Sequence, residues 1–235
     1  MVIKNVHCLF EQSGTFKNVF LKLGIPAFDY DIKNDFKQTD FICDLFYEIE
    51  QCYSGNSSIF DKFDINDLLF AFFPCIRFEN QILLSFNGVQ SHDKNKDNVF
   101  LLERDIRLHN ELNLYYSLIS KLSIICFKRR LRCIIENPYS STHYLARYWC
   151  LKPALIDIDR TRRGDRFKKP TQYWFINCDV ANNFVLDALE YYPQKIRTVN
   201  SFCNKAEKSL ITSLYAKRFI KEFILGDDYE ICFKK

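Results

Sequence analysis

Short apolar runs alternate with longer amphipathic stretches along the 235 residues of this chain. Short runs bounded by turn residues predict buried strands, and apolar residues recurring every three or four positions predict helices. The runs predict strands at 5–10, 27–31, 67–73, 133–136, 155–159 and 173–178. The helical spacing predicts helices at 15–23, 98–131 and 206–224. This alternation indicates an α/β fold with a mostly parallel sheet and helices on both faces.

The chain length fits one α/β domain with a full core, and no repeat, low-complexity tract or linker divides residues 1–235. Residues 85–97 are polar and lack periodicity, which is typical of a loop. No segment approaches the ~18 consecutive apolar residues of a membrane span, and no basic stretch precedes an apolar one at the N-terminus. We therefore expect a soluble, intracellular, single-domain protein with no membrane partner.

The ten cysteines show no metal-binding or disulfide spacing. No two are separated by two to four residues, and neither Cys-x-x-Cys nor His-x-His occurs. We therefore predict no metal site and interpret most cysteines as core residues in a reducing compartment. Cys75 is different because it follows Phe73-Pro74 at the end of a predicted strand, where α/β enzymes place their chemistry.

The formal net charge of +4 conceals a basic block. Residues 128–169 contain twelve Lys or Arg against four acidic residues. Such a block indicates contact with phosphates, and a solvated basic surface is the alternative interpretation.

Two further segments end predicted strands with polar residues. The small-residue turn at 10–14 lies between a strand and a helix, where backbone N–H groups favour anionic or polar ligand groups. Asp29-Tyr30-Asp31 ends the second strand, where this kind of fold uses a carboxylate to accept ribose hydroxyls. Turn formation and helix capping are the alternative roles of these acids.

The order of a Phe-x-x-x-Gly turn, Phe73-Pro74-Cys75 and then Glu136-Asn137 resembles DNA cytosine-5 methyltransferases. The segment 169–174, Lys-Pro-Thr-Gln-Tyr-Trp, is similar to compact phage and prophage proteins of this type. The resemblance implies a Rossmann-like, class I methyltransferase fold in the cytoplasm of a bacterial or phage-infected cell. Gln12 replaces the first glycine of the family's turn, and Ile76 replaces the glutamine after Pro-Cys.

The resemblance also implies S-adenosylmethionine as the cofactor. Asp29 would accept from the ribose, Tyr30 would stack on adenine, and Asp44 would accept from the adenine amino group. The implied cofactor-binding residues are Phe10, Glu11, Gln12, Ser13, Gly14, Asp29, Tyr30, Asp31, Asp44 and Pro74.

In the implied reaction, the Cys75 thiolate adds to C6 of cytosine and C5 then accepts a methyl group. Glu136 would protonate or hydrogen-bond N3, Asn137 would orient Glu136 or the base, and the loop at 76–97 would close over the target. The basic residues expected to contact nucleic acid are Arg77, Arg160, Arg162, Lys168 and Lys169. Residues 179–205 are too few for a target-recognition domain, so the DNA partner is expected to be single-stranded or delivered by a specificity partner.

Two alternatives remain open. Asn137-Pro138-Tyr139 partly resembles the Asn-Pro-Pro-aromatic motif of amino-methyltransferases, although the second proline is missing. The altered turn and Ile76 would also suit a catalytically inactive protein that keeps the fold and binds nucleic acid or a partner. The oligomeric state and the target sequence are left open.

Overall fold

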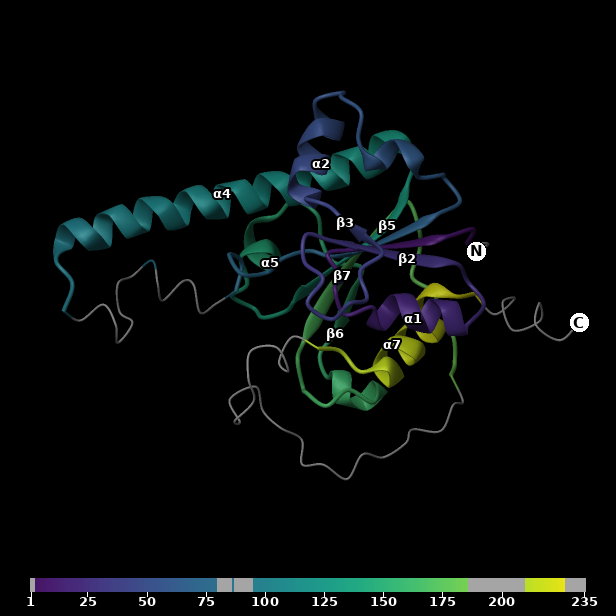
Figure 1. Cartoon of the computed structure of the whole chain (residues 1–235). Helices are drawn as coiled ribbons and strands as arrows, with labels where there is room; N and C mark the ends of the chain where they lie inside the picture. Colours follow the sequence, from purple (N-terminus) through teal and green to yellow (C-terminus); the bar gives the residue numbers. More distant parts are fainter. Residues whose placement is uncertain (1–2, 80–85, 87–94, 186–209, 227–235) are drawn as a thin grey trace, which may run out of the picture.

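The computed structural model describes residues 3–79, 86, 95–185 and 210–226. A seven-stranded sheet lies at its centre, with helices on both faces (Figure 1). Its strands are β1 (Val6–Leu9), β2 (Ala27–Asp31), β3 (Phe41–Ile42), β4 (Leu68–Phe72), β5 (Arg132–Pro138), β6 (Leu155–Asp157) and β7 (Thr171–Ile176).

The strand order is β3-β2-β1-β4-β5-β7-β6. The first five strands in this order run parallel, and β7 is antiparallel to both β5 and β6. Every residue of β1 is buried, as are Leu68 to Ala71 of β4, because helices cover the sheet on both sides. The predicted α/β architecture with a mostly parallel sheet is confirmed and is compatible with a Rossmann-like fold.

Four helices and a π-helical turn cover the two faces of the sheet. On one face, α1 (Thr15–Lys22) packs with α7 (Ser213–Phe219) and η4 (Ile220–Ile224). On the other face, α2 (Leu45–Tyr53) packs with the C-terminal part of α4 (Asn98–Arg129). The shorter elements are η1 (Ile59–Lys62), α5 (Tyr144–Tyr148) and η3 (Arg160–Arg163).

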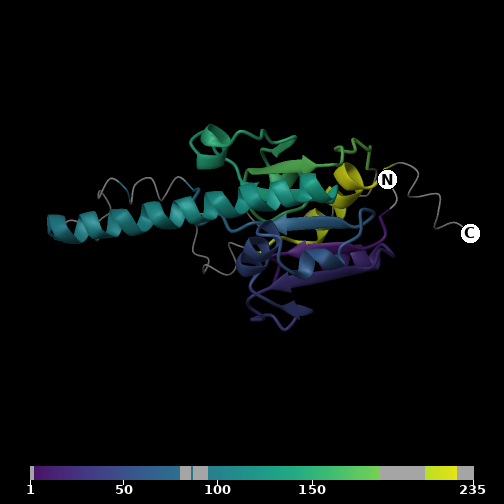
Figure 2. The same ribbon diagram turned by 90° about the horizontal axis from the view of Figure 1, so that it is seen from above.

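The helix α4 matches the helix predicted at 98–131, and only its C-terminal part is buried. Its 32 residues correspond to roughly 48 Å at ~1.5 Å per residue. The N-terminal part extends beyond the sheet (Figure 2), so Leu102 and Ile106 are 65% and 63% exposed. The buried stretch begins at Leu118. None of the described helices, α4 included, is long and apolar enough to cross a membrane.

Some elements differ from the prediction. The strand β3 and the helix α2 were not predicted, although Leu45, Ile49 and Cys52 share one buried helix face. The first residues of the helix predicted at 206–224 lie outside the described residues, and so does most of the loop predicted at 85–97. Within the described part, α7 and η4 continue as one helical segment to Ile224.

Gly164 and Gly55 provide a matched test of the packing between η3 and α7. Both have positive φ, +87° and +82°. A Cβ at Gly164 would lie 2.5 Å from Leu214 Cδ2, whereas nothing lies within 4 Å of a Cβ at Gly55. We expect Gly55→Ala to lower the free energy of unfolding by about 1–2 kcal/mol through backbone strain. Gly164→Ala should lose a further ~1–3 kcal/mol because Leu214 must move. Urea unfolding measures both, and equal losses would contradict this packing.

Candidate functional site

The candidate residues gather at the carboxyl edge of the sheet. The strands β1, β2, β4 and β5 are parallel, so the residues that end or follow them emerge at one edge. From β1 the chain continues into α1 on one face, whereas the helix after β4, α4, covers the opposite face. Ligands of open α/β sheets bind in the crevice at such a switch between neighbouring strands.

Cys75 follows β4 and is partly buried at this edge. Its Sγ donates a hydrogen bond to Glu79 Oε1 at 3.0 Å. Burial and the Glu79 carboxylate raise the pKa of the Cys75 thiol far above its ordinary value. The Lys169 ammonium opposes this rise and the Glu136 carboxylate adds to it, so both groups act on the sulfur. Strand pairing also brings these residues together, because Glu136 lies opposite Phe72, near Cys75, and Pro138 lies opposite Thr171, near Lys169. The raised pKa keeps the Cys75 thiol protonated.

Glu136 lies near the end of β5 and is only 9% exposed. Burial raises the pKa of this carboxyl group, while Lys169 and Arg160 oppose the rise. A carboxyl group in such surroundings can hold a proton and donate a hydrogen bond.

Asn137 connects the ends of β5 and β4. It is fully buried, and its Nδ2 donates to the carbonyl oxygens of Phe73 at 2.7 Å and Glu136 at 3.1 Å. This contact fixes the Phe73-Pro74-Cys75 segment against Glu136. Asn137 therefore positions the segment that carries Cys75.

Two buried polar residues near Asn137 were not predicted as site residues. Gln172 lies opposite Asn137 in the β5–β7 pair, and its Nε2 donates to Pro138 O at 2.7 Å and lies 3.2 Å from His143 Nδ1. Among the described residues, Asn137 Oδ1, His143 Nε2 and Gln172 Oε1 are buried without a hydrogen-bond partner. In the sequence, Gln172 is marked only by being an amide within the mostly apolar strand β7.

The turn after β1 differs from the prediction. The Glu11 carboxylate accepts from the backbone N–H groups of Phe16 at 2.8 Å and Lys17 at 3.2 Å. Two of the N–H donors expected to face a ligand are therefore already occupied. Burial raises the pKa of Glu11 to about 7.

The remaining residues of this turn keep it tight and close to Cys75. Phe10 and Gly14 both have positive φ, +62° and +64°. The Phe10 ring packs edge-on against Phe73, with centroids 5.3 Å apart. Ser13 Oγ lies 3.0 Å from Thr15 Oγ1, and Gln12 Oε1 is buried with no partner among the described residues.

Asp29 and Tyr30 do not reach the edge as predicted. Asp29 is fully buried and accepts from Lys17 Nζ at 3.0 Å and from Asp40 N at 2.7 Å. Tyr30 is in the core, where its hydroxyl lies 3.0 Å from His7 Nδ1. Both side chains therefore lie inside the fold, and Asp29 Oδ2 is buried without a hydrogen-bond partner among the described residues.

The other two acids predicted to bind the cofactor, Asp31 and Asp44, lie closer to the surface. Asp31 is the last residue of β2, half-buried, and accepts from Lys33 N at 2.8 Å. The next residue, Ile32, is 62% exposed. Asp44 is exposed and caps α2 by accepting from Phe46 N at 3.0 Å and Tyr47 N at 3.3 Å.

The five predicted nucleic-acid contacts separate into paired and exposed residues. Arg160 is 2% exposed, forms an ion pair with Asp165 and lies over the Tyr215 ring, so the prediction of a phosphate contact there is wrong. Arg77 is also engaged, in an ion pair with Glu111 of α4. Arg162 and Lys168 are exposed, and Lys169 is half-buried beside Cys75 and Glu136.

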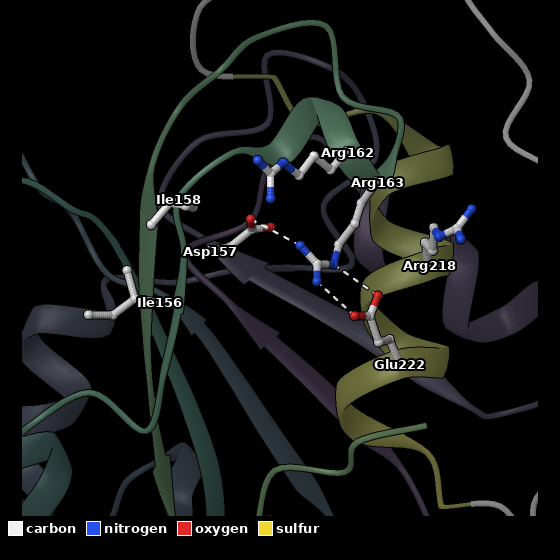
Figure 3. Close-up of a pocket in the computed structure, with 7 residues that line it drawn as sticks. All are labelled: Ile156, Asp157, Ile158, Arg162, Arg163, Arg218 and Glu222. Carbon is white, nitrogen blue, oxygen red and sulfur yellow. Dashed lines mark hydrogen bonds and ion pairs between the residues drawn. The ribbon is translucent and has the colours of Figure 1, made fainter. Parts of the chain in front are cut away.

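Arg162 also lines a cavity of about 300 Å³ beyond the end of β6 (Figure 3). Arg163 crosses this cavity, donates to both carboxylate oxygens of Glu222 at 2.9 and 2.7 Å, and lies 3.1 Å from Asp157. The Arg162 side chain is 71% exposed, with Asp159 3.9 Å away. The lining residues are Ile156, Asp157, Ile158, Arg162, Arg163, Arg218 and Glu222, which leaves one positive charge in excess.

No model of a known protein family matches this chain, and no curated protein matches it in sequence.

The buried His143 predicts how stability depends on pH. Burial lowers the pKa of His143 to about 4, whereas the unfolded chain takes up this proton near pH 6.5. The stability that depends on neutral His143 is therefore complete above about pH 6.5 and is lost as the pH falls towards 4. We expect wild-type protein to lose roughly 3 kcal/mol over this range relative to His143→Gln. Urea unfolding of both proteins at several pH values measures the difference, and parallel pH profiles would contradict it.

Proposed function

We propose that this chain is an S-adenosylmethionine-dependent methyltransferase that methylates C5 of cytosine in DNA through a Cys75 adduct. The observation that carries the proposal is the grouping of Cys75, Glu136 and Lys169 at the ends of adjoining strands. A thiol, a buried carboxyl group and a cation are the groups that addition to a pyrimidine ring requires.

The sheet topology supports the proposed class. Apart from β7, the strands of the sheet follow the order 3-2-1-4-5-6 of nucleotide-binding doubly wound folds. The additional antiparallel strand β7 between β5 and β6 agrees with the class I methyltransferase fold that the sequence resemblance implies.

The residues at the ends of β1 and β2 and at the start of α2 suit S-adenosylmethionine, but their roles differ from those that the sequence resemblance implies. Asp31 takes the ribose role because it is the acid at the strand end, and exposed Ile32 offers an apolar surface to adenine. Asp44 accepts from the adenine amino group, and the buried unpaired Gln12 Oε1 is an acceptor beside the turn. The bound cofactor supplies an electrophilic methyl group.

In the proposed chemistry, Cys75 adds to C6 of cytosine while Glu136 donates its proton towards N3. Asn137 holds the two strand ends in register through Phe73 O. A base inside a duplex cannot reach these groups, so the target is single-stranded or turned out of the helix.

The exposed basic residues are placed for phosphate contact. Two strand spacings of ~4.8 Å separate β6 from β5, or about 10 Å across the sheet. Successive nucleotides of a stacked DNA strand are ~3.4 Å apart. A DNA strand whose target base lies at Glu136 therefore reaches β6 within about three nucleotides. We assign two exposed cations, Arg162 on η3 and Lys168 before β7, to these phosphates.

One observation favours a second candidate function. The Glu11 carboxylate occupies N–H groups that begin α1, as expected of a methyltransferase fold that binds nucleic acid without a cofactor. The amino-methyltransferase alternative is less favoured, because the Asn137 amide points inward to Phe73 O.

Cofactor binding separates these two functions. We expect calorimetry to show stoichiometric binding of S-adenosylmethionine, and Asp31→Ala to raise the dissociation constant tenfold or more because the ribose loses its acceptor. Asp35→Ala removes the same charge from an exposed position of the same loop and should bind like wild type.

Transfer of a labelled methyl group to cytosine in single-stranded DNA, abolished by Cys75→Ser, completes this test. A folded wild-type protein that takes up no cofactor would exclude the enzyme and favour the binding protein.

Arg162 predicts a change in the salt dependence of DNA binding. We expect Arg162→Ala to weaken binding of a single-stranded oligonucleotide and to reduce the slope of log K against log salt by ~0.7, the value for one phosphate contact. Arg129→Ala removes the same charge from the end of α4, where Arg129 pairs with Asp61 at 2.7 Å, and should leave the slope unchanged. Fluorescence titration measures both slopes, and equal slopes for the two variants would rule out the assigned contact.

A further inference from the structure

Glu79 is held against Cys75 by a tight turn. Phe78 N donates to Cys75 O at 2.8 Å, and this turn places Glu79 Oε1 3.0 Å from Cys75 Sγ. The Phe78 side chain is 1% exposed and packs between the rings of Phe73 and Tyr144. The buried Phe78 ring therefore fixes the position of Glu79, although Glu79 itself is only partly buried.

The charged groups that act on the sulfur come from three segments. Glu79 belongs to the turn after β4, Glu136 to β5 and Lys169 to the segment before β7. Burial and the two carboxylates disfavour the thiolate, and Lys169 is the cation that opposes them. The nucleophile therefore rests as a thiol and needs a proton acceptor as it attacks.

Of these groups, Glu79 is suited to accept that proton. A Lys169 ammonium has no lone pair to accept a proton, and the proposed reaction requires Glu136 to donate one to N3. Glu79 Oε1 already accepts the S–H hydrogen bond. A base must lie within hydrogen-bond reach of the proton it removes, and this contact meets that requirement.

We propose that Glu79 is the general base that accepts the Cys75 proton during attack on cytosine, an inference that rests on the proposed methyltransferase function. As the S–C6 bond forms, the S–H bond breaks and its proton moves to Glu79 Oε1. The electrons of the C5=C6 bond move into the ring, where the proton from Glu136 at N3 stabilises them. After methylation and loss of the C5 proton to solvent, the C6–S bond breaks, N3 returns its proton to Glu136, and the sulfur recovers its proton from Glu79.

Glu79→Gln keeps the shape of the side chain and removes its basicity, and two measurements on it should change in opposite directions. The first is the pH profile of Cys75 alkylation by iodoacetamide, followed by peptide mass spectrometry with exposed Cys150 as internal reference. Loss of the carboxylate should move the midpoint to lower pH and accelerate alkylation several-fold near pH 8.

The second measurement is the rate of covalent adduct formation with an oligonucleotide containing 5-fluorocytosine, in which C5 has no proton to lose. Loss of the base should slow this rate by about 10²-fold. Glu111→Gln, which removes a carboxylate from α4 that pairs with Arg77 instead, should change neither measurement in these directions.

The possible results separate the two proposals. Unchanged alkylation, or slower alkylation together with a slower adduct rate in a folded variant, would overturn the role of Glu79 alone. An adduct rate equal to wild type would do the same. If the wild-type protein forms no adduct, the proposed function and the general base fail together, whereas a shifted alkylation midpoint would still show that Glu79 controls the Cys75 proton.

Discussion

The parallel hydrogen bonding of β1, β4 and β5 is the constraint on which the candidate site depends. It brings the ends of these strands to one edge, although the turn at 10–14, Cys75 and Glu136 are far apart in the sequence. The Asn137 amide then joins the end of β5 to the chain leaving β4 through Phe73 O. Because Asn137 is fully buried, loss of this contact would leave Phe73 O without its amide donor and would loosen the segment that carries Cys75.

Buried and partly buried ion pairs fix the helices around the sheet and withdraw charged residues from solvent. Lys17 on α1 pairs with Asp29 on β2, and Arg163 on η3 pairs with Glu222 on η4. Arg160, also on η3, pairs with Asp165. Removing one partner of such a pair costs more than the pair contributes, because the other charge stays buried. The basic block at 128–169 therefore contributes fewer cations to the surface than its composition indicates.

The sequence predicted every strand of the sheet except β3, but it could not predict the direction of individual side chains. The strand predicted at 27–31 is β2, and its bounds match the prediction. Within that strand, the sequence could not show which acid faces the core. The answer depends on Lys17 and Asp40, which lie on other elements. Arg160 was misassigned for the same reason, and Glu79 was missed because its contact with Cys75 requires the turn at Phe78.

Burial favours the neutral form of the two central groups of the site, the Cys75 thiol and the Glu136 carboxyl group. It raises the pKa of both groups. Addition of sulfur to a pyrimidine needs one proton removed from the nucleophile and another supplied to the ring. Two carboxyl groups near one thiol can perform these opposite tasks only if their surroundings differ. Glu136 is buried and influenced by the charges of Lys169 and Arg160, whereas Glu79 lies in the more open turn after β4 and already accepts the S–H hydrogen bond of Cys75.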